Sequence, residues 1–313
     1  MSAEPIPNKV RAPRNRTITL DPSELESLRN GLVFASGIEP IDAHDRVICG
    51  DSFSVLKRLP AASFDLLFAD PPYNLNKEFG QESFHQRSPD EYEAWLKSWL
   101  LLSIPLLKPT ASVYICGDWR SSSAIQRIGS KHLKLQNRIT WEREKGRGAK
   151  KNWKNAAEDI WFFTVSDEFT FNVDAVKIRR KVLAPYKNNG KPKDWTEAAN
   201  GNYRDTHPSN IWTDISVPFW SMPENTDHPT QKPEKLLAKI VLASTNVGDL
   251  ILDPFAGSGT TAVVAKKLGR KFVAVESDEQ YCLIAQKRLE MAETDNDIQG
   301  FSDGVFWERN SGR

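Results

Sequence analysis

The chain has 313 residues, of which 39% are hydrophobic and 27% charged, and its formal net charge is +1. This composition is typical of a globular protein with one large core, and it excludes a disordered chain. The longest apolar run, residues 95–107, is interrupted by Lys97 and Pro105, so we expect a soluble cytoplasmic protein without a membrane partner.

The predicted elements begin after an N-terminal tail. Residues 1–40 are rich in Pro and Arg and lack hydrophobic periodicity, so we expect them to be flexible. A helix is expected to begin at Ser88, because Ser88 can cap it, Pro89 suits the first position and Glu91 completes a capping box. Short apolar runs predict buried strands at residues 46–51, 64–70, 111–116, 137–142 and 159–164.

The regular pattern stops between about Val176 and Asn225. This segment is polar and contains Pro, Asn, Gly and Trp, and so long an irregular stretch is usually functional or disordered. Alternating strands and helices before and after it predict an α/β fold with a doubly wound, mostly parallel sheet. The main domain is then residues 41–292, with 176–225 as an insertion and 293–313 as a C-terminal tail. After the insertion, a helix is predicted from Pro233, strands at 250–253 and 271–276, and helices at 260–268 and 279–292.

A glycine-containing loop, DPFAGSGTT at residues 253–261, follows a predicted strand and begins a helix. Gly257 and Gly259 allow a tight turn and a close approach to a ligand. Glu276 ends the next strand, where a carboxylate can accept hydrogen bonds from ribose hydroxyls. The loop lacks the third glycine of a dinucleotide motif and the lysine of a phosphate loop, so it favours a nucleoside without a pyrophosphate. A plain strand-to-helix turn is the alternative.

A second motif, DPPYN at residues 70–74, lies at the end of another predicted strand. Its two prolines stiffen the backbone and donate no hydrogen bonds, so the Pro71 carbonyl oxygen is expected to face a ligand. Together with the Asp70 carboxylate, it can accept both hydrogens of a planar amino group and direct the nitrogen lone pair toward a methyl donor. Tyr73 offers a ring on which a planar base can stack. An acidic Pro-Pro turn without a function is the alternative.

On these motifs the chain resembles the amino-group DNA methyltransferases of bacterial restriction–modification systems, the N(4)/N(6)-methyltransferase family. Within that family it resembles the beta class, in which the catalytic motif precedes the cofactor motif. Residues 70–73 match the catalytic tetrapeptide, 255–259 the cofactor loop and 228–233 (HPTQKP) the signature upstream of that loop. The resemblance covers about residues 45–292. It implies a Rossmann-like methyltransferase fold with permuted motif order and an inserted target-recognition region.

The resemblance implies that S-adenosylmethionine methylates an exocyclic amino group in DNA. An Asp at the first position of the catalytic motif favours N6 of adenine, and cytosine N4 on the same scaffold is the alternative. Because such an amino group lies inside a duplex, the base must rotate out of the stack. The catalytic residues are expected to be Asp70, Pro71, Pro72 and Tyr73. The cofactor is expected to contact Asp51, Asp70, His228, Thr230, Lys232, Asp253, Phe255, Ala256, Gly257, Ser258, Gly259, Thr260 and Glu276.

The charge distribution agrees with a polyanionic partner, although a solvated basic face would look the same. Residues 131–193 carry 16 Lys and Arg against 7 Asp and Glu. Trp141 is a second candidate for base stacking, with a core position as the other interpretation. We expect base-edge contacts from Asn202, Arg204 and Asn210. Phosphate contacts are expected from Lys150, Lys151, Lys154, Arg179, Arg180 and Lys181.

Other functions stay open at this point. An RNA or protein methyltransferase can carry a related motif, but such motifs begin with Asn, and a DNA-binding regulator with an inactive site is more distant. No cysteine follows a Pro, which argues against methylation of a cytosine ring carbon, and the Cys and His spacing predicts neither a disulfide nor a metal site. The resemblance implies a prokaryotic or phage protein that acts on double-stranded DNA. A cognate restriction endonuclease and a homodimer are further partners that it suggests.

Overall fold

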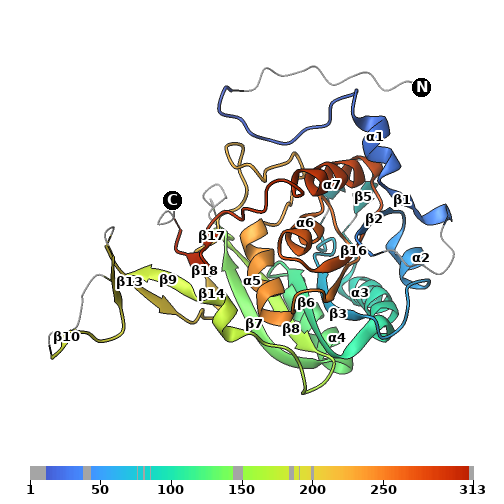
Figure 1. The fold of residues 1–313 in the computed structure, drawn as a ribbon. Coiled ribbons are helices and arrows are strands. Elements are labelled where there is room, and N and C mark those ends of the chain that lie inside the picture. Colours follow the sequence, from blue (N-terminus) through green and yellow to red (C-terminus); the bar gives the residue numbers. More distant parts are fainter. Residues whose placement is uncertain are drawn as a thin grey trace.

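A nine-stranded sheet forms the centre of the computed structural model (Figure 1). The structure describes residues 12–37, 44–75, 77–79, 82–84, 86–143, 151–182, 187–189, 191–198 and 201–309. Neighbouring strands are parallel except at β8, which is antiparallel to β6 and β7, so the predicted doubly wound, mostly parallel sheet is confirmed. In sheet order the strands are β1 (Val33–Phe34), β2 (Arg46–Cys49), β16 (Lys271–Glu276), β15 (Leu250–Asp253), β3 (Phe64–Ala69), β6 (Leu107–Gly117), β8 (Ala157–Thr164), β7 (Lys134–Glu142) and β14 (Ile211–Trp212).

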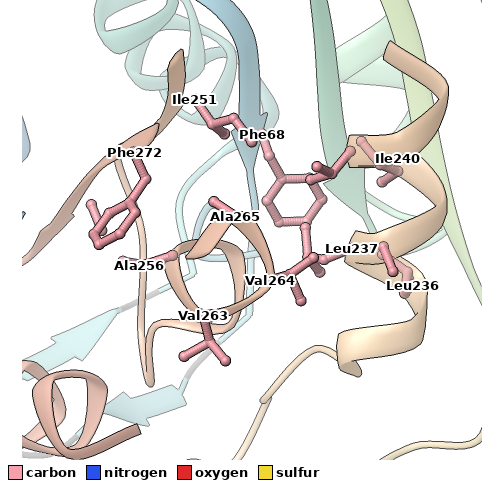
Figure 2. Packing of buried hydrophobic residues seen from close by; sticks show 14 of the residues in the cluster. Phe68, Leu236, Leu237, Ile240, Ile251, Ala256, Val263, Val264, Ala265 and Phe272 are labelled. Atoms are coloured by element: carbon pink, nitrogen blue, oxygen red, sulfur yellow. The ribbon is translucent and has the colours of Figure 1, made fainter. Parts of the chain in front are cut away.

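Helices cover both faces of this sheet, and each face has its own buried apolar cluster. On one face Phe68 and Ile251 of the sheet pack toward Ile240 of α5 and Val264 of α6, as Figure 2 shows. No described helix is long and apolar enough to cross a membrane. The helices of this face are α5 (Glu234–Ser244), α6 (Thr260–Lys267) and α7 (Glu279–Met291), and those of the other face are α2 (Ser52–Leu56), α3 (Pro89–Ser103) and α4 (Ser122–His132). Short 3-10 turns are η1 (Ala35–Gly37), η2 (Ile104–Leu106) and η3 (Val173–Val176).

Local signals account for where several helices begin. The Ser88 side chain accepts from the Glu91 backbone N–H, and the Glu91 side chain accepts from the Ser88 backbone N–H, which confirms the predicted capping box of α3. The Asp278 side chain caps α7 by accepting from the backbone N–H groups of Gln280 and Tyr281. These bonds satisfy backbone donors that have no partner inside the helix.

The segment predicted to be irregular contains a second, antiparallel arrangement of strands, so that prediction was wrong. Its strands lie beside two strands from the C-terminal region, because β18 pairs with β9. The expectation of a plain tail over residues 293–313 was therefore also wrong for residues 301–307. This sheet projects to one side of the molecule (Figure 1). In sheet order it consists of β12 (Thr196–Ala198), β13 (Gly201–Thr206), β9 (Ile178–Lys181), β18 (Val305–Trp307) and β17 (Phe301–Ser302). Two hairpins are β4–β5 (Lys77–Phe79, Glu82–Phe84) and β10–β11 (Lys187–Asn188, Lys191–Pro192).

The predicted N-terminal tail also contributes to the fold. Within it, α1 (Leu25–Asn30) packs beside α7, where Arg29 pairs with Glu279 at 3.3 Å, and Leu28 is buried. Strand β1 pairs in parallel with β2 and forms one edge of the main sheet. Two-residue strands and six-residue helices carry too few residues to show a period, which is why the sequence pattern missed them.

The sheet order brings the two motifs together. Strand β15, which leads to the glycine loop, lies between β16 and β3, which lead to Glu276 and Asp70. The carboxyl ends of adjacent parallel strands meet at the same edge of a sheet, which is where such sheets bind ligands. The permuted motif order is therefore compatible with one site.

Candidate active site

A cleft with about 1000 Å³ of empty space opens at the carboxyl ends of β3, β15 and β16. The catalytic motif, the glycine loop and the HPTQKP segment all contribute to its wall. Three segments far apart in the sequence thus form one concave site. The lining residues are Phe68, Asp70, Pro71, Pro72, Tyr73, Leu75, His228, Thr230, Gln231, Lys232, Asp253, Phe255, Ala256, Gly257, Ser258, Thr260, Thr261, Glu276, Ser277 and Tyr281.

Asp253 stabilises the glycine loop by hydrogen bonds to other residues of the same loop. Its Oδ1 accepts from the Phe255 backbone N–H at 3.0 Å, and its Oδ2 accepts from the Thr261 hydroxyl at 2.5 Å. Burial raises the pKa of Asp253 to about 7, although these two hydrogen bonds act in the opposite direction. Both carboxylate oxygens accept hydrogen bonds from within the loop. The main role of Asp253 is therefore to hold the loop in its conformation, and its charge is less available to a ligand.

The two glycines of the loop serve different contacts. Gly259 has a φ of 77°, and a Cβ added there would lie 2.5 Å from the Ala285 Cβ, so the loop packs directly on α7. Gly257 has a φ of 53°, and a Cβ there would lie 2.9 Å from Nε2 of His228. A side chain at Gly257 would therefore displace His228 from the wall of the cleft, and one at Gly259 would push the loop away from α7.

Glu276 holds the rim of the loop. Its Oε2 accepts from the Gly257 backbone N–H at 2.8 Å, and its Oε1 accepts from the Asp278 N–H at 2.9 Å. Burial raises the pKa of Glu276, because it penalises the charged carboxylate more than these bonds favour it. The Ser277 hydroxyl also donates to Oε1, at 3.4 Å. A carboxylate offers about four acceptor positions, so one remains for a hydroxyl group of a ligand.

The catalytic motif is held by contacts from several elements. Oδ1 of Asp70 accepts from the Tyr73 hydroxyl at 2.9 Å. The Pro72 carbonyl oxygen accepts from the Tyr92 hydroxyl at 3.2 Å, and Asn74 exchanges two hydrogen bonds with the backbone of Arg87. Among the described residues, no donor reaches the carbonyl oxygen of Pro71. Pro71 and Asp70 both line the cleft.

Lys232 lies against the catalytic carboxylate. Its Nζ donates to Oδ2 of Asp70 at 2.5 Å and lies 3.3 Å from the Tyr73 hydroxyl, and its side chain is 6% exposed. Burial disfavours the charge of Lys232, but Asp70 and then Glu158 outweigh that effect and raise its pKa. Burial, Asp70 and Glu158 also raise the pKa of Tyr73, so its hydroxyl stays protonated and acts as a donor.

His228 and Thr230 form the wall opposite the glycine loop. The His228 ring meets the Tyr281 ring edge-on, with 4.4 Å between centroids, and its Nδ1 lies 3.3 Å from the Thr230 backbone N. Gln231 anchors the HPTQKP segment to the residues before it. Its side chain accepts from Thr226 and donates to the Glu224 carbonyl oxygen at 2.6 Å. The HPTQKP segment is thus fixed in place before α5 begins.

Most predicted cofactor residues line this cleft, but Asp51 and Gly259 do not. Asp51 is exposed and caps α2 by accepting from the Ser54 N–H at 2.8 Å. It lies near Glu276 in the fold, because the N–H of the preceding residue, Gly50, donates to the Glu276 carbonyl oxygen. Sequence reasoning missed six lining residues. Four of them lie in or beside the quoted motifs, where the motifs could have found them, whereas Phe68 and Tyr281 have no signal of their own. The six are Phe68, Leu75, Gln231, Thr261, Ser277 and Tyr281.

The residues expected to contact DNA do not form one group. Trp141 is 1% exposed and donates to the Ile215 carbonyl oxygen at 3.0 Å, so it is a core residue and offers no face to a base. Lys151, Lys154 and Lys181 are exposed, and Lys150 lies outside the described residues. Three of the arginines are paired within the protein: Arg179 with Asp205, Arg204 with Asp194, and Arg180 with Glu308 at 3.7 Å. Asn202 lies on β13, and Asn210 donates to the Arg138 carbonyl oxygen at 3.1 Å.

Comparison with known proteins identifies the family. Residues 64–287 match the family described as DNA methylase. The chain is 37% identical over 254 residues to the DNA adenine methyltransferase YhdJ of Escherichia coli, covering 79% of this chain and 83% of that protein. It is 33% identical to the type II methyltransferase M.HpaI of Haemophilus parainfluenzae, covering 82% and 76%. The chain therefore belongs to the DNA methylase family.

Solved structures agree on the fold. The M1.HpyAVI–SAM complex aligns with a TM-score of 0.54 at 23% identity, covering 78% of this chain and 98% of that one. The cytosine-N4-specific PvuII DNA methyltransferase aligns with a TM-score of 0.60 at 20% identity, covering 84% and 92%. These alignments confirm the predicted Rossmann-like methyltransferase fold.

Proposed function

We propose that the chain transfers a methyl group from S-adenosylmethionine to the exocyclic N6 of adenine in DNA, at a specific sequence. The observation that carries this proposal is that Asp70 and Pro71 line the same cleft as the glycine loop and Glu276. The part of the cleft formed by Asp70 and Pro71 suits an amino group, and the part formed by the glycine loop and Glu276 suits a nucleoside. Adenine is favoured because YhdJ, a relative at 37% identity, is a DNA adenine methyltransferase.

The cleft fits S-adenosylmethionine by its shape and its donor set. The space between Gly257 and His228 admits no protein side chain, and the Glu276 carboxylate has an acceptor position left for a ribose hydroxyl. Phe255 and Tyr281 supply apolar walls for a planar ring. When bound, the cofactor supplies an electrophilic methyl group. Asp51, Thr230 and Lys232 are the remaining positions that the family resemblance assigns to cofactor binding.

Asp70 and Pro71 activate the amine by accepting its hydrogens. An exocyclic amino nitrogen is a weak nucleophile because its lone pair is conjugated with the ring. Two acceptors that bind its hydrogens favour a tetrahedral nitrogen, whose lone pair is no longer conjugated with the ring and can attack a methyl group. In such a transfer the bond from the methyl carbon to the sulfonium sulfur would break as the bond to the amino nitrogen formed, leaving a neutral thioether. The amino group would lose one proton along its hydrogen bond to Asp70.

The target base has to leave the duplex to reach these acceptors. Unstacking costs a few kcal/mol, which aromatic stacking in the site can offset. Tyr73 lines the cleft directly beside Asp70, so we assign the stacking role to Tyr73. Trp141 is excluded from that role by its burial.

The DNA backbone is expected to meet the edge of the sheet beside the cleft. The segment before β8 carries the exposed Lys151 and Lys154, and between them Trp153 is 94% exposed. Lysines of this kind supply salt-dependent contacts to phosphates, and an exposed aromatic ring can stack on a base. We assign sequence recognition to the antiparallel sheet around β9 and β13, within residues 176–225. A cognate restriction endonuclease and a homodimer are further proposals.

Nucleoside analysis tests this function. The purified chain is incubated with radiolabelled S-adenosylmethionine and DNA, and the DNA is then digested to nucleosides, which are separated by mass. Labelled N6-methyl-2′-deoxyadenosine is the expected product. Labelled N4-methyl-2′-deoxycytidine would show that the substrate base is cytosine and not adenine, with the same site, and unlabelled DNA would overturn the proposal.

A further inference from the structure

Three charged side chains lie behind the catalytic carboxylate of Asp70, and two of them, Lys232 and Glu158, are buried. Lys232 Nζ contacts Oδ2 of Asp70 at 2.5 Å and Oε2 of Glu158 at 3.4 Å. Arg143, whose backbone follows β7, donates to the other oxygen of Glu158. The side chains of Lys232 and Glu158 are only 6% and 4% exposed, so their charges interact in a medium that screens them weakly. Neither Glu158 nor Arg143 belongs to a motif.

The two carboxylates compete for one ammonium group. Both oxygens of Asp70 are occupied, since Oδ1 accepts from Tyr73 and Oδ2 from Lys232. Oε2 of Glu158, by contrast, is buried and has no hydrogen-bond partner among the described residues, although Lys232 is its neighbour. A buried acceptor without a partner costs free energy, and it gains a partner if the ammonium moves toward it.

We propose that Glu158 is a positioning residue that shares Lys232 with Asp70 and thereby frees Asp70 to accept from the target amino group. A carboxylate bound closely by a cation is a poor acceptor for a neutral amine. Glu158 draws the same cation away and so keeps Asp70 available, while Arg143 holds Glu158 in place from the far side. This inference rests on the proposed function of Asp70 as the acceptor for the amine.

The position of Glu158 in the fold supports this assignment. It is the second residue of β8, the strand that is antiparallel to its neighbours. The start of β8 therefore lies at the same sheet edge as the carboxyl end of β3, where Asp70 follows. Trp141 on β7 lies opposite Glu158 on β8 in the strand register. The guanidinium of Arg143 lies 5.8 Å from the centre of the Trp141 ring. The buried Trp141 thus helps to fix the position of Arg143, which in turn holds Glu158.

Two substitutions separate charge from shape. Glu158→Gln keeps the size of the side chain and its acceptor for Arg143 but removes the charge, whereas Glu158→Asp keeps the charge and shortens the side chain. We expect Glu158→Gln to lower the single-turnover rate of methyl transfer by about 10- to 100-fold, with Glu158→Asp retaining more activity. Cofactor and DNA dissociation constants should stay within about threefold of those of the wild type.

Asp214→Asn is the matched control. Asp214 is a buried carboxylate that is also shared between two lysines, Lys235 at 2.8 Å and Lys239 at 2.7 Å, but it does not line the cleft. Its replacement should lower the melting temperature without a selective loss of rate. Combining Glu158→Gln with Lys232→Met adds a further test, because the two effects on melting temperature should be non-additive if the residues interact.

The outcomes are distinct. The inference is overturned if Glu158→Gln keeps the wild-type rate, or if it is more active than Glu158→Asp. It is also overturned if Glu158→Gln weakens cofactor binding by the same factor as it lowers the rate. Additive shifts in melting temperature in the double variant also overturn it. Unlabelled DNA with the wild-type chain would instead refute the proposed function, and the melting data would still decide whether Glu158 and Lys232 are coupled.

Discussion

At the scale of single residues, Asp70 is the side chain on which the proposed chemistry depends most. Replacing it by Ala removes the acceptor for the amine but leaves Glu158 as a counter-charge for Lys232, so the fold should persist. We expect methyl transfer to fall by more than about 100-fold. The measurement is transfer of label to DNA, with circular dichroism as the check on folding. A rate within about tenfold of the wild type would remove Asp70 from its assigned role.

Glu276 tests the cofactor half of the site. Glu276→Ala should raise the dissociation constant of S-adenosylmethionine by roughly 10- to 150-fold, because it removes a charged hydrogen-bond partner and the acceptor that holds Gly257. Isothermal titration calorimetry measures this directly. Glu276→Gln is the control, since an amide oxygen can still accept from Gly257 and the loss should be smaller. Unchanged affinity in both variants would show that Glu276 does not contact the cofactor.

At the scale of elements, the glycine loop and α7 are packed too closely for any side chain at Gly259. An alanine there meets both an unfavourable φ of 77° and the Ala285 Cβ at 2.5 Å. We expect Gly259→Ala to lower the free energy of unfolding by about 2–4 kcal/mol. Gly248→Ala is a matched control, because Gly248 also has a positive φ, 88°, but a Cβ there meets nothing within 4 Å. Its cost should be about 1–2 kcal/mol, the backbone contribution alone.

Urea unfolding distinguishes these two variants. Equal losses for both glycines would mean that the loop can move away from α7 at little cost. A larger loss for Gly259, with poorer cofactor binding, would show that this contact sets the position of the loop.

The second sheet is the element proposed to read the DNA sequence. Exchanging residues 176–225 for the corresponding segment of a relative with another target should change the methylated sequence without abolishing methyl transfer. Methylation-sensitive sequencing of DNA treated with the hybrid gives the result. Because β18 pairs with β9, the exchange should include residues 301–307 from the same relative. An active hybrid that keeps the original target would place recognition elsewhere.

At the scale of the whole molecule, the pH dependence of stability should reflect a buried carboxyl group away from the cleft. Glu224 accepts from the Glu234 backbone N–H at 2.7 Å, and burial, together with the nearby Glu234, raises its pKa to about 8 from 4.5. Between these values the folded state binds more protons than the unfolded state. The contribution of Glu224 to stability is therefore full below 4.5 and is lost as the pH rises through about 8.

Glu224→Gln removes this dependence while keeping an acceptor for Glu234. Relative to the wild type, the variant should be more stable by roughly 1–3 kcal/mol at about pH 9 than at about pH 5. Urea unfolding at the two pH values measures the difference. Glu293→Gln is the control, because Lys266 lowers the pKa of this exposed carboxyl and it is ionised at both values. An identical effect of Glu224→Gln at both pH values would contradict the raised pKa.

Sequence and structure agree best where the signal is local. The capping box at Ser88 and the turn at Gly257 depend on neighbours within a few residues, so their patterns predicted the geometry found. The meeting of Asp70 and Glu276 in one cleft also followed from the sequence, because parallel strands present their carboxyl ends at one edge in any order of connection.

By itself, then, the sequence determined the fold class, the family and the core of the site. Only the tertiary structure decided that Trp141 is buried, that the C-terminal strands extend the second sheet, and that Glu158 faces Lys232. Each of these depends on contacts between residues far apart in the chain. A single side chain or a two-residue strand carries no period or motif, and its partner is chosen by how the whole sheet and its helices pack.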